Sequence, residues 1–411
     1  LLRPVAARGY RLHAKLLPSA LDLASGEPSL RDAVGAVLGG RGRWLAGQRK
    51  RWTDALAPPA SPTEDDWSHG RTAARVAFLR HERATAPDAA RERLTGELAQ
   101  LGADERTELV GCLAVGLGPA DEVLLQALLG DRAVEVRRRA ARLLVRLPAS
   151  ARSTAIGAAL AALLGKDKRG AWTIDAPDTE PPGVKALGLE PRPKTDELGE
   201  RAFWLFQLVR NAPLATWTTN TGMSPAEIVA WAAKSDWSAA LLRGIRDALL
   251  AAPDLEWTRA LLGKWVVKAL GPSDEDVQAL LPWPERERVW KAHLERERAP
   301  GLLHVVDEIA SVAGPEDRLG PDLAALLARL LSVSLGTNDS AFDGDDADSL
   351  LVACAALPDV ALSPLKTIRR DDRLMPRFDE TVDRVEQLVD VRLRIASLAS
   401  APPAAVIPRI P

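Results

Sequence analysis

The strongest constraint on the fold is a pair of apolar stripes at helical spacing in residues 118–148, which read GPADEVLLQALLGDRAVEVRRRAARLLVRLP. A Gly130-Asp131 break separates the two halves. The first stripe is Val123, Leu124, Ala127 and Leu128, and the second is Val136, Ala140, Leu143, Leu144 and Leu147. This spacing predicts two amphipathic helices joined by a short turn, with the charged residues of the second helix on its opposite face.

The same periodicity runs through most of the chain, and the connectors are short and carry Gly, Pro or Asp. Short connectors make neighbouring helices antiparallel. The scarcity of Phe and Tyr, at 5 and 1 residues, argues against a large sheet. Most of the 12 tryptophans fall on apolar stripes, where we expect them to fill space between helices. We therefore predict an all-α chain.

One Pro-rich and charged stretch, residues 166–197, has no sustained period and is predicted to be a long loop or a linker. It would divide the chain into N-terminal helical repeats at 1–165 and C-terminal helical repeats at 198–400, followed by a frayed tail at 401–411. Because the chain begins with Leu1 rather than Met, we interpret it as a fragment or a processed product.

The second predicted helix of the 118–148 pair resembles the second helix of a HEAT repeat. The resemblance rests on Asp131, on Val136-Arg137, and on the small Ala140 followed by Leu144. In such repeats the Asp and Arg side chains bridge neighbouring repeats, and the Ala lets paired helices approach closely. Because one such unit cannot bury its faces alone, other helices are expected to stack on it. The predicted fold is an irregular α-solenoid of HEAT-like antiparallel helix pairs.

A second distinctive stretch is RGRWLAGQRKRW, residues 41–52, which is strongly basic. On a continuous helix, Trp44, Gln48 and Trp52 would share one face at i, i+4 and i+8. We interpret this face as structural, with both tryptophans docking the helix onto its neighbours and the arginines at the rim. The candidate partner-binding residues are Arg41, Arg43 and Arg51 in this stretch and Arg138, Arg142 and Arg146 in the HEAT-like helix.

Taken together, three segments resemble a bacterial family of unknown function whose members carry HEAT-like helices. These are residues 16–52, the HEAT-like centre DEVLLQALLGDRAVEVRRRAARLLVRLPASA, and LGERAFWLFQLVRNAPLATW with the later DW and EWTRALL. Family members often have Asn-Pro where Arg49-Lys50 stand here. The resemblance implies a gene neighbourhood with a MoxR-type AAA+ ATPase, a von Willebrand A-domain protein and a SWIM zinc-finger protein.

No nucleotide-hydrolysis or hydrolase motif is found in the sequence. Gly165-Lys166 and Gly263-Lys264 lack the remaining residues of a phosphate-binding loop, and there is no G-x-S-x-G or H-E-x-x-H pattern. We expect Cys112 and Cys354 to be buried apolar residues, without a disulfide. The chain is therefore predicted to be non-enzymatic and to need no cofactor or metal.

Two further residue sets were weighed as ligands and set aside. The histidines are scattered and are expected on helix surfaces: His13, His69, His81, His293 and His304. The acidic cluster of Asp343, Asp345, Asp346 and Asp348 lacks the EF-hand order, so a solvated loop is favoured over a cation site.

The leading functional hypothesis is a scaffold or adaptor that binds protein partners, with the AAA+ ATPase and the von Willebrand A-domain protein as candidates. The alternative is a HEAT-like nucleic-acid-binding protein with a basic concave face. The net charge of -2 disfavours nucleic acid, and no apolar run is long enough to cross a membrane. We expect a cytoplasmic protein.

Overall fold

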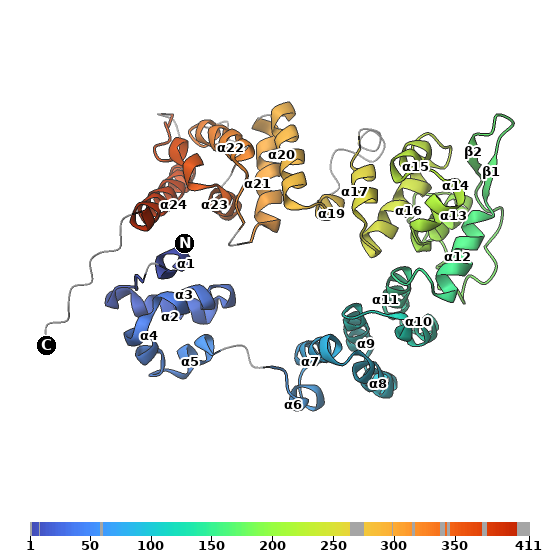
Figure 1. Ribbon diagram of the computed structural model, residues 1–411, viewed down its shortest axis with the longest axis horizontal. Helices are drawn as coiled ribbons and strands as arrows, with labels where there is room; N and C mark the ends of the chain where they lie inside the picture. Colours follow the sequence, from blue (N-terminus) through green and yellow to red (C-terminus); the bar gives the residue numbers. More distant parts are fainter. Residues whose placement is uncertain are drawn as a thin grey trace. The chain divides into compact units, whose positions relative to one another are not determined.

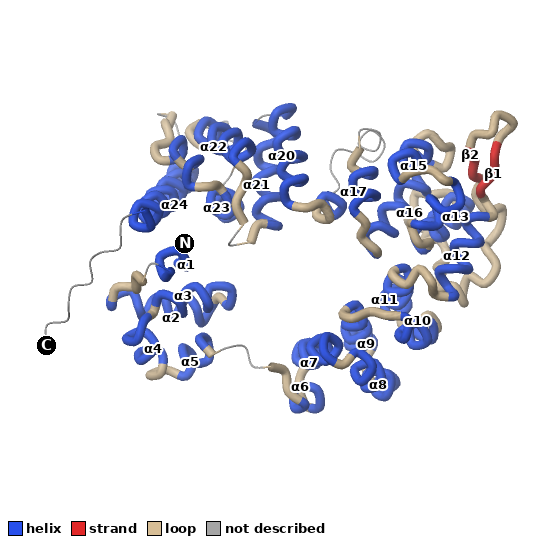
Figure 2. Tube along the Cα trace, viewed as in Figure 1, coloured by secondary structure: helices blue, strands red, loops and turns tan. Residues whose placement is uncertain are grey.

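The computed structural model describes residues 2–7, 9–57, 61–263, 275–297, 299–314, 317–337, 342, 346–371 and 376–400. Helices account for 69% of the described residues and strands for 2%, which confirms that this part of the chain is mostly helical (Figures 1 and 2). The chain forms two compact units, residues 61–281 and residues 1–60 with 282–411. Neither boundary coincides with the predicted division at 166–197. The predicted tail at 401–411 lies outside the described residues.

The unit of residues 61–281 contains short helices in close succession and one hairpin. Its helices are α6 (Glu64–Ser68), α7 (Thr72–Thr85), α8 (Pro87–Glu97), α9 (Ala103–Gly111), α10 (Glu122–Leu128), α11 (Val134–Val145), α12 (Ala151–Ala161), α13 (Glu200–Asn211), α14 (Ala215–Thr221), α15 (Pro225–Ala232), α16 (Ser238–Ala251), α17 (Leu255–Leu261) and α19 (Glu275–Gln278). Three 3-10 helices join them: η3 (Leu98–Gln100), η4 (Cys112–Ala114) and η5 (Pro119–Asp121).

The predicted stripe of α11 is buried as expected, with Val136, Ala140 and Leu144 fully covered. The stripe predicted for α10 is only partly correct. Leu128 is buried and Leu124 packs on the core, but Val123 is 81% exposed and the buried Leu125 was not predicted. This helix is only seven residues long and follows a 3-10 turn, so its few apolar residues fit two faces of a helix almost equally well.

The turn before α11 is held by the residues of the HEAT-like signature. Asp131 accepts a hydrogen bond from the Ala133 amide at 2.7 Å and pairs with Arg106 of α9 at 3.1 Å. Arg137 donates to the Asp131 carbonyl at 2.9 Å. Asp131 thus joins the start of α11 to an earlier helix, while Val136 lies in the core.

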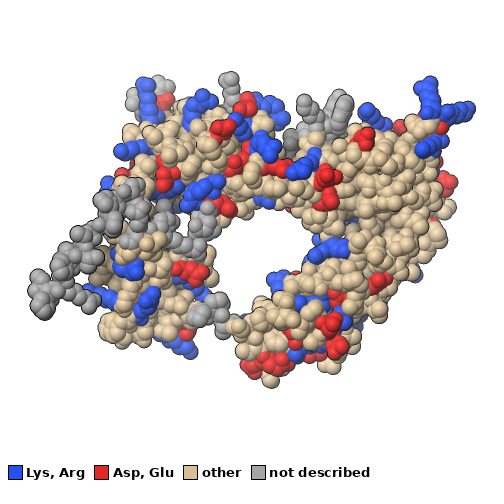
Figure 3. All heavy atoms as spheres, viewed as in Figure 1, with Lys and Arg blue, Asp and Glu red and all other residues tan. Residues whose placement is uncertain are grey.

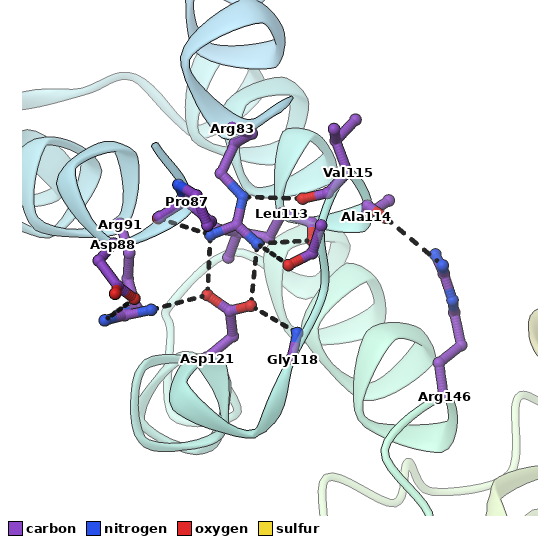
Figure 4. Close-up of polar contacts among 11 residues, drawn as sticks. Arg83, Pro87, Asp88, Arg91, Leu113, Ala114, Val115, Gly118, Asp121 and Arg146 are labelled. Carbon is purple, nitrogen blue, oxygen red and sulfur yellow. Dashed lines mark hydrogen bonds and ion pairs between the residues drawn. The ribbon is translucent and has the colours of Figure 1, made fainter. Parts of the chain in front are cut away.

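A buried ion pair ties α7 to the loop that leads into α10. The Arg83 side chain is 0% exposed and the Asp121 side chain 2% exposed, and they form two hydrogen bonds of 3.0 and 2.9 Å (Figure 4). Asp121 also accepts the Gly118 amide at 3.0 Å. The remaining Arg83 donors reach the carbonyl oxygens of Pro87, Leu113, Val115 and Gly116. One guanidinium therefore provides hydrogen bonds to four backbone carbonyls, three of them in the irregular segment between α9 and α10.

The stretch 166–197 is not a linker but a loop packed into this unit. It starts in an antiparallel hairpin of β1 (Leu164–Lys166) and β2 (Trp172–Ile174), in which Leu164 pairs with Ile174 and Lys166 with Trp172. Ile174, Ala176, Val184 and Leu189 are buried in the same core as α13 and α16. These apolar residues have no regular spacing, so the sequence pattern did not reveal their burial.

Helices α13 and α16 form the centre of this core. Eight residues of α13 are buried: Phe203, Trp204, Leu205, Phe206, Gln207, Leu208, Val209 and Asn211. The two helices lie close together at Gly244, where a Cβ would lie 2.6 Å from the Val209 Cγ1 atom. Glycine at this point lets the end of α13 reach the middle of α16.

The unit of residues 1–60 and 282–411 is also helical. Its helices are α1 (Leu2–Ala7), α2 (Leu17–Gly26), α3 (Arg31–Val37), α4 (Gly39–Ala46), α5 (Lys50–Leu56), α20 (Trp283–Glu297), α21 (Ala299–Val312), α22 (Pro321–Ser334), α23 (Ala347–Ala356) and α24 (Pro376–Ser400). The 3-10 helices are η1 (Ala14–Leu16), η2 (Pro28–Leu30), η6 (Asp359–Ala361) and η7 (Ser363–Leu365). In the parts of the chain that the structure describes, no helix has both the length and the apolar character needed to cross a membrane.

Candidate functional sites: an exposed tryptophan surface and an arginine pocket

The basic stretch of residues 41–52 forms two helices and not the single helix predicted. Helix α4 ends at Ala46 and α5 begins at Lys50. Gly47 caps α4 by donating to the Arg43 carbonyl at 3.2 Å, and Arg49 is extended, with φ −137° and ψ 125°. The prediction that Trp44, Gln48 and Trp52 share one face is therefore wrong, because it needed an unbroken helix.

The two tryptophans of this stretch have opposite environments. Trp52 is 4% exposed, and its indole donates to Asp22 Oδ1 of α2 at 2.8 Å. The Arg49 guanidinium covers its ring at 4.6 Å, and Arg51 pairs with the same Asp22 carboxylate. The pKa of Asp22 is lowered by the Trp52 hydrogen bond and by the charge of Arg51. Trp52 therefore docks α5 onto α2, as predicted.

Trp44, by contrast, is 66% exposed, so its predicted docking role is wrong. Gln48 donates to the Trp44 carbonyl at 3.2 Å and does not lie between two indoles. Arg41 and Arg43 are also exposed, and within the described residues their side chains form no hydrogen bond or ion pair. We call Arg41, Arg43 and Trp44 the Trp44 surface. Among the described residues, the Trp44 indole is mostly exposed and the two guanidinium groups have no partner, so these side chains contribute little to the fold of this unit.

A second feature, in the unit of residues 61–281, is a cavity of about 510 Å³ with four arginines in its wall. We call it the arginine pocket. Its lining residues are Arg138, Ala141, Arg142 and Val145 of α11, Gly188 and Glu190 of the packed loop, Gln207, Arg210 and Asn211 of α13, Arg246, Asp247, Leu250 and Ala251 of α16, and Asp276 and Ala279 at α19. Three helices that are far apart in the sequence thus contribute one arginine or more each.

Three of the four arginines in the pocket wall have carboxylate partners there. Arg138 Nε donates to Glu190 at 2.9 Å. Arg210 lies 3.2 Å from Asp247. Arg246 pairs with Asp276 at 2.8 Å.

Arg142 is the remaining arginine, and it is exposed without a hydrogen bond or ion pair among the described residues. Its positive charge also acts on Arg210. Burial is the main cause that lowers the pKa of Arg210, and the charges of Arg142 and Arg243 lower it further, against the opposing effect of Asp247. The residues that line the pocket therefore include more arginines than carboxylates.

A fifth arginine lies behind the pocket wall. Arg152 of α12 is 2% exposed and donates to the Leu187 carbonyl at 2.8 Å and to Asn211 Oδ1 at 2.7 Å. No carboxylate among the described residues pairs with it, and its Nη1 has no hydrogen-bond partner. Burial lowers the pKa of Arg152 to about 10. Because Asn211 lines the pocket, this uncompensated charge lies directly behind the wall.

Arg146, the third arginine predicted on α11, lies elsewhere. Its Nη2 donates to the Ala114 carbonyl at 3.4 Å, within the loop that Arg83 holds from the other side (Figure 4). Sequence reasoning thus found Arg138 and Arg142 of the pocket but missed Arg210 and Arg246. The one available signal was a cation near the end of the otherwise apolar run FWLFQLVRN.

The thiols have no reactive environment. Cys112 and Cys354 are both buried and unpaired, as predicted, and burial raises the pKa of both, that of Cys354 to about 12. All five histidines are at least partly exposed, also as predicted. Of the acidic cluster, Asp343 and Asp345 lie outside the described residues, while Asp348 pairs with Arg384 at 3.1 Å.

Charges of both signs are interspersed on the face drawn in Figure 3, where no continuous basic stripe is visible. Basic residues on this face are commonly accompanied by acidic ones.

The chain belongs to the family of unknown function DUF5691, which it matches over residues 1–398. No curated protein and no solved structure matches it.

Proposed function

We propose that the chain is a non-enzymatic scaffold that binds an acidic segment of a protein partner through the Trp44 surface. The observation that carries this proposal is the 66% exposure of Trp44 next to two exposed arginines, Arg41 and Arg43, that have no partner among the described residues. Tryptophan and arginine are the residues that most often contribute the binding energy at protein interfaces. An indole beside two unneutralised guanidinium groups is suited to a partner that offers carboxylates and an apolar contact.

The proposed architecture of the scaffold is an irregular α-solenoid with HEAT-like helix pairs. In support, several helices of the 61–281 unit pack on helices one or two places away in the chain: α7 on α8 and α9, α9 on α11, α10 on α11, and α12 on α13. The central pair, α13 and α16, is three places apart. Such nearest-neighbour packing is typical of repeat proteins, which present long surfaces to partners. The candidate partners are the MoxR-type AAA+ ATPase and the von Willebrand A-domain protein, in the cytoplasm.

The test is affinity capture with the tagged full chain in its host, followed by mass spectrometry for these two proteins. We compare the wild type with Trp44→Ala and with a matched control, Val123→Ala, which removes another exposed apolar side chain in the other unit. The expected result is recovery of a named partner by wild type and control and its loss with Trp44→Ala. Equal recovery with Trp44→Ala, or capture of neither partner by the wild type, would contradict the proposal.

The alternative of nucleic-acid binding would use the unpaired Arg41 and Arg43 for phosphate contacts. Several other predicted cations are already engaged, since Arg51 pairs with Asp22 and Arg138 with Glu190. A mobility shift on duplex DNA at low salt that disappears in Arg41→Gln/Arg43→Gln would favour this alternative over a protein partner.

A further inference from the structure

We infer that the arginine pocket is a binding site for a small molecule that carries a phosphate group. This site is independent of the Trp44 surface, because all of its residues belong to the 61–281 unit. Its volume of about 510 Å³ exceeds what one inorganic phosphate needs. The volume lies within the range of about 300–1,000 Å³ that is usual for small-molecule sites.

The charge count favours a dianion. The wall holds four arginines and three carboxylates, Glu190, Asp247 and Asp276, which leaves one positive charge. Arg152 behind the wall adds a second charge without a carboxylate. Glu135 also contacts Arg138, but it is not among the residues that line the pocket. A phosphate monoester carries roughly 1.5 to 2 negative charges at pH 7, which matches this excess better than a single carboxylate does.

The donor groups fit an oxyanion as well. Arg142 has unused N–H groups and can offer two parallel ones to a phosphate. Arg210 and Arg246 are held in the wall by Asp247 and Asp276, so their positions are set before a ligand arrives. Preorganised donors lose little entropy on binding. The two carboxylates therefore serve to fix the cations, while Arg142 supplies the uncommitted charge.

Titration calorimetry on the purified full chain provides the test, with inorganic phosphate, pyrophosphate and ribose 5-phosphate as probes in buffers of equal ionic strength. The key variant is Arg142→Gln, because the Arg142 side chain is exposed and has no hydrogen bond or ion pair among the described residues. The matched control is Arg146→Gln, which makes the same charge change one turn along α11 but outside the pocket. Arg142→Lys keeps the charge and removes the paired N–H groups.

We expect wild type and Arg146→Gln to bind at least one phosphate probe, and Arg142→Gln to bind it about tenfold or more weakly, as befits the loss of a charged hydrogen bond. Arg142→Lys should fall between them. Binding of the organic phosphate alone would identify a phosphorylated metabolite, and equal binding of inorganic phosphate would identify the free ion as a sufficient ligand. The inference is overturned if no probe binds or if both Gln variants lose affinity equally.

Discussion

Replacing Asp121 by Asn tests whether the buried Arg83 ion pair stabilises the 61–281 unit. The substitution keeps the side-chain shape but removes the charge that faces a guanidinium with 0% exposure. Breaking a buried ion pair by neutralising one partner costs about 3 to 5 kcal/mol. We expect the low end, about 3 kcal/mol, because four backbone carbonyls still accept hydrogen bonds from Arg83.

The assay is differential scanning calorimetry of the full chain. It resolves two transitions if the two units unfold at different temperatures. For a unit of this size, a loss of about 3 kcal/mol lowers the melting temperature by about 6 to 12 °C. The control is Asp88→Asn. Asp88 contacts Arg91, as Asp121 does, but its side chain is 75% exposed, so the expected loss is below about 1 kcal/mol.

An apolar double variant, Arg83→Met with Asp121→Leu, separates the ion pair from the backbone contacts. If the pair mattered only through its charges, burying two apolar side chains would restore stability. We expect no recovery, because the carbonyls of Leu113, Val115 and Gly116 would lose their buried donor. A destabilisation below about 1 kcal/mol for Asp121→Asn, or full recovery in the double variant, would refute this reasoning.

Three further outcomes follow from burial. Trp44→Ala should change the free energy of unfolding by less than about 0.5 kcal/mol, whereas Trp52→Ala should lower it by about 3 to 5 kcal/mol; denaturant titration distinguishes them. Gly244→Ala should destabilise the chain by about 1 to 3 kcal/mol in the same titration, because its Cβ would meet Val209 at 2.6 Å; a neutral effect would mean that α13 and α16 can separate. Cys354 should resist thiol labelling at pH 8 until the chain unfolds, because burial raises its pKa to about 12. Its contribution to stability should be lost as the pH rises above the ordinary thiol value of 9.0, and a pH-independent unfolding free energy across that range would contradict the assignment.

The sequence predicted α11 well because a long apolar stripe has only one helical face that can enter the core. Val136, Ala140 and Leu144 lie where the period put them. The same reasoning failed for the 41–52 stretch. Its periodicity put Trp44 and Trp52 on one helical face, but Gly47 and the extended Arg49 end the helix between them. The helix break at residues 47–49 thus determines which indole is buried, and the hydrophobic pattern does not predict this break.

The arginine pocket was only half visible in the sequence. Arg138 and Arg142 were found because they share one charged face of α11. Arg210 and Arg246 lie near them because α13 and α16 pack closely at Gly244. Local sequence patterns do not predict which distant helices pack together. The Arg83 contacts were hidden for the same reason, since its partners are mainly carbonyls about thirty residues away in the chain.

An arginine that already pairs with a carboxylate or a carbonyl of the chain is a weaker candidate for partner binding than one without such a partner. The number of arginines on a helix face does not make this distinction. Arg51 pairs with the Asp22 carboxylate, and Arg146 donates a hydrogen bond to the Ala114 carbonyl, so both have a partner within the chain. Arg41 and Arg142 have no such engagement among the described residues. In both places the unpaired arginine adjoins a second feature suited to a partner: Arg41 is close in sequence to the exposed Trp44, and Arg142 lines the arginine pocket.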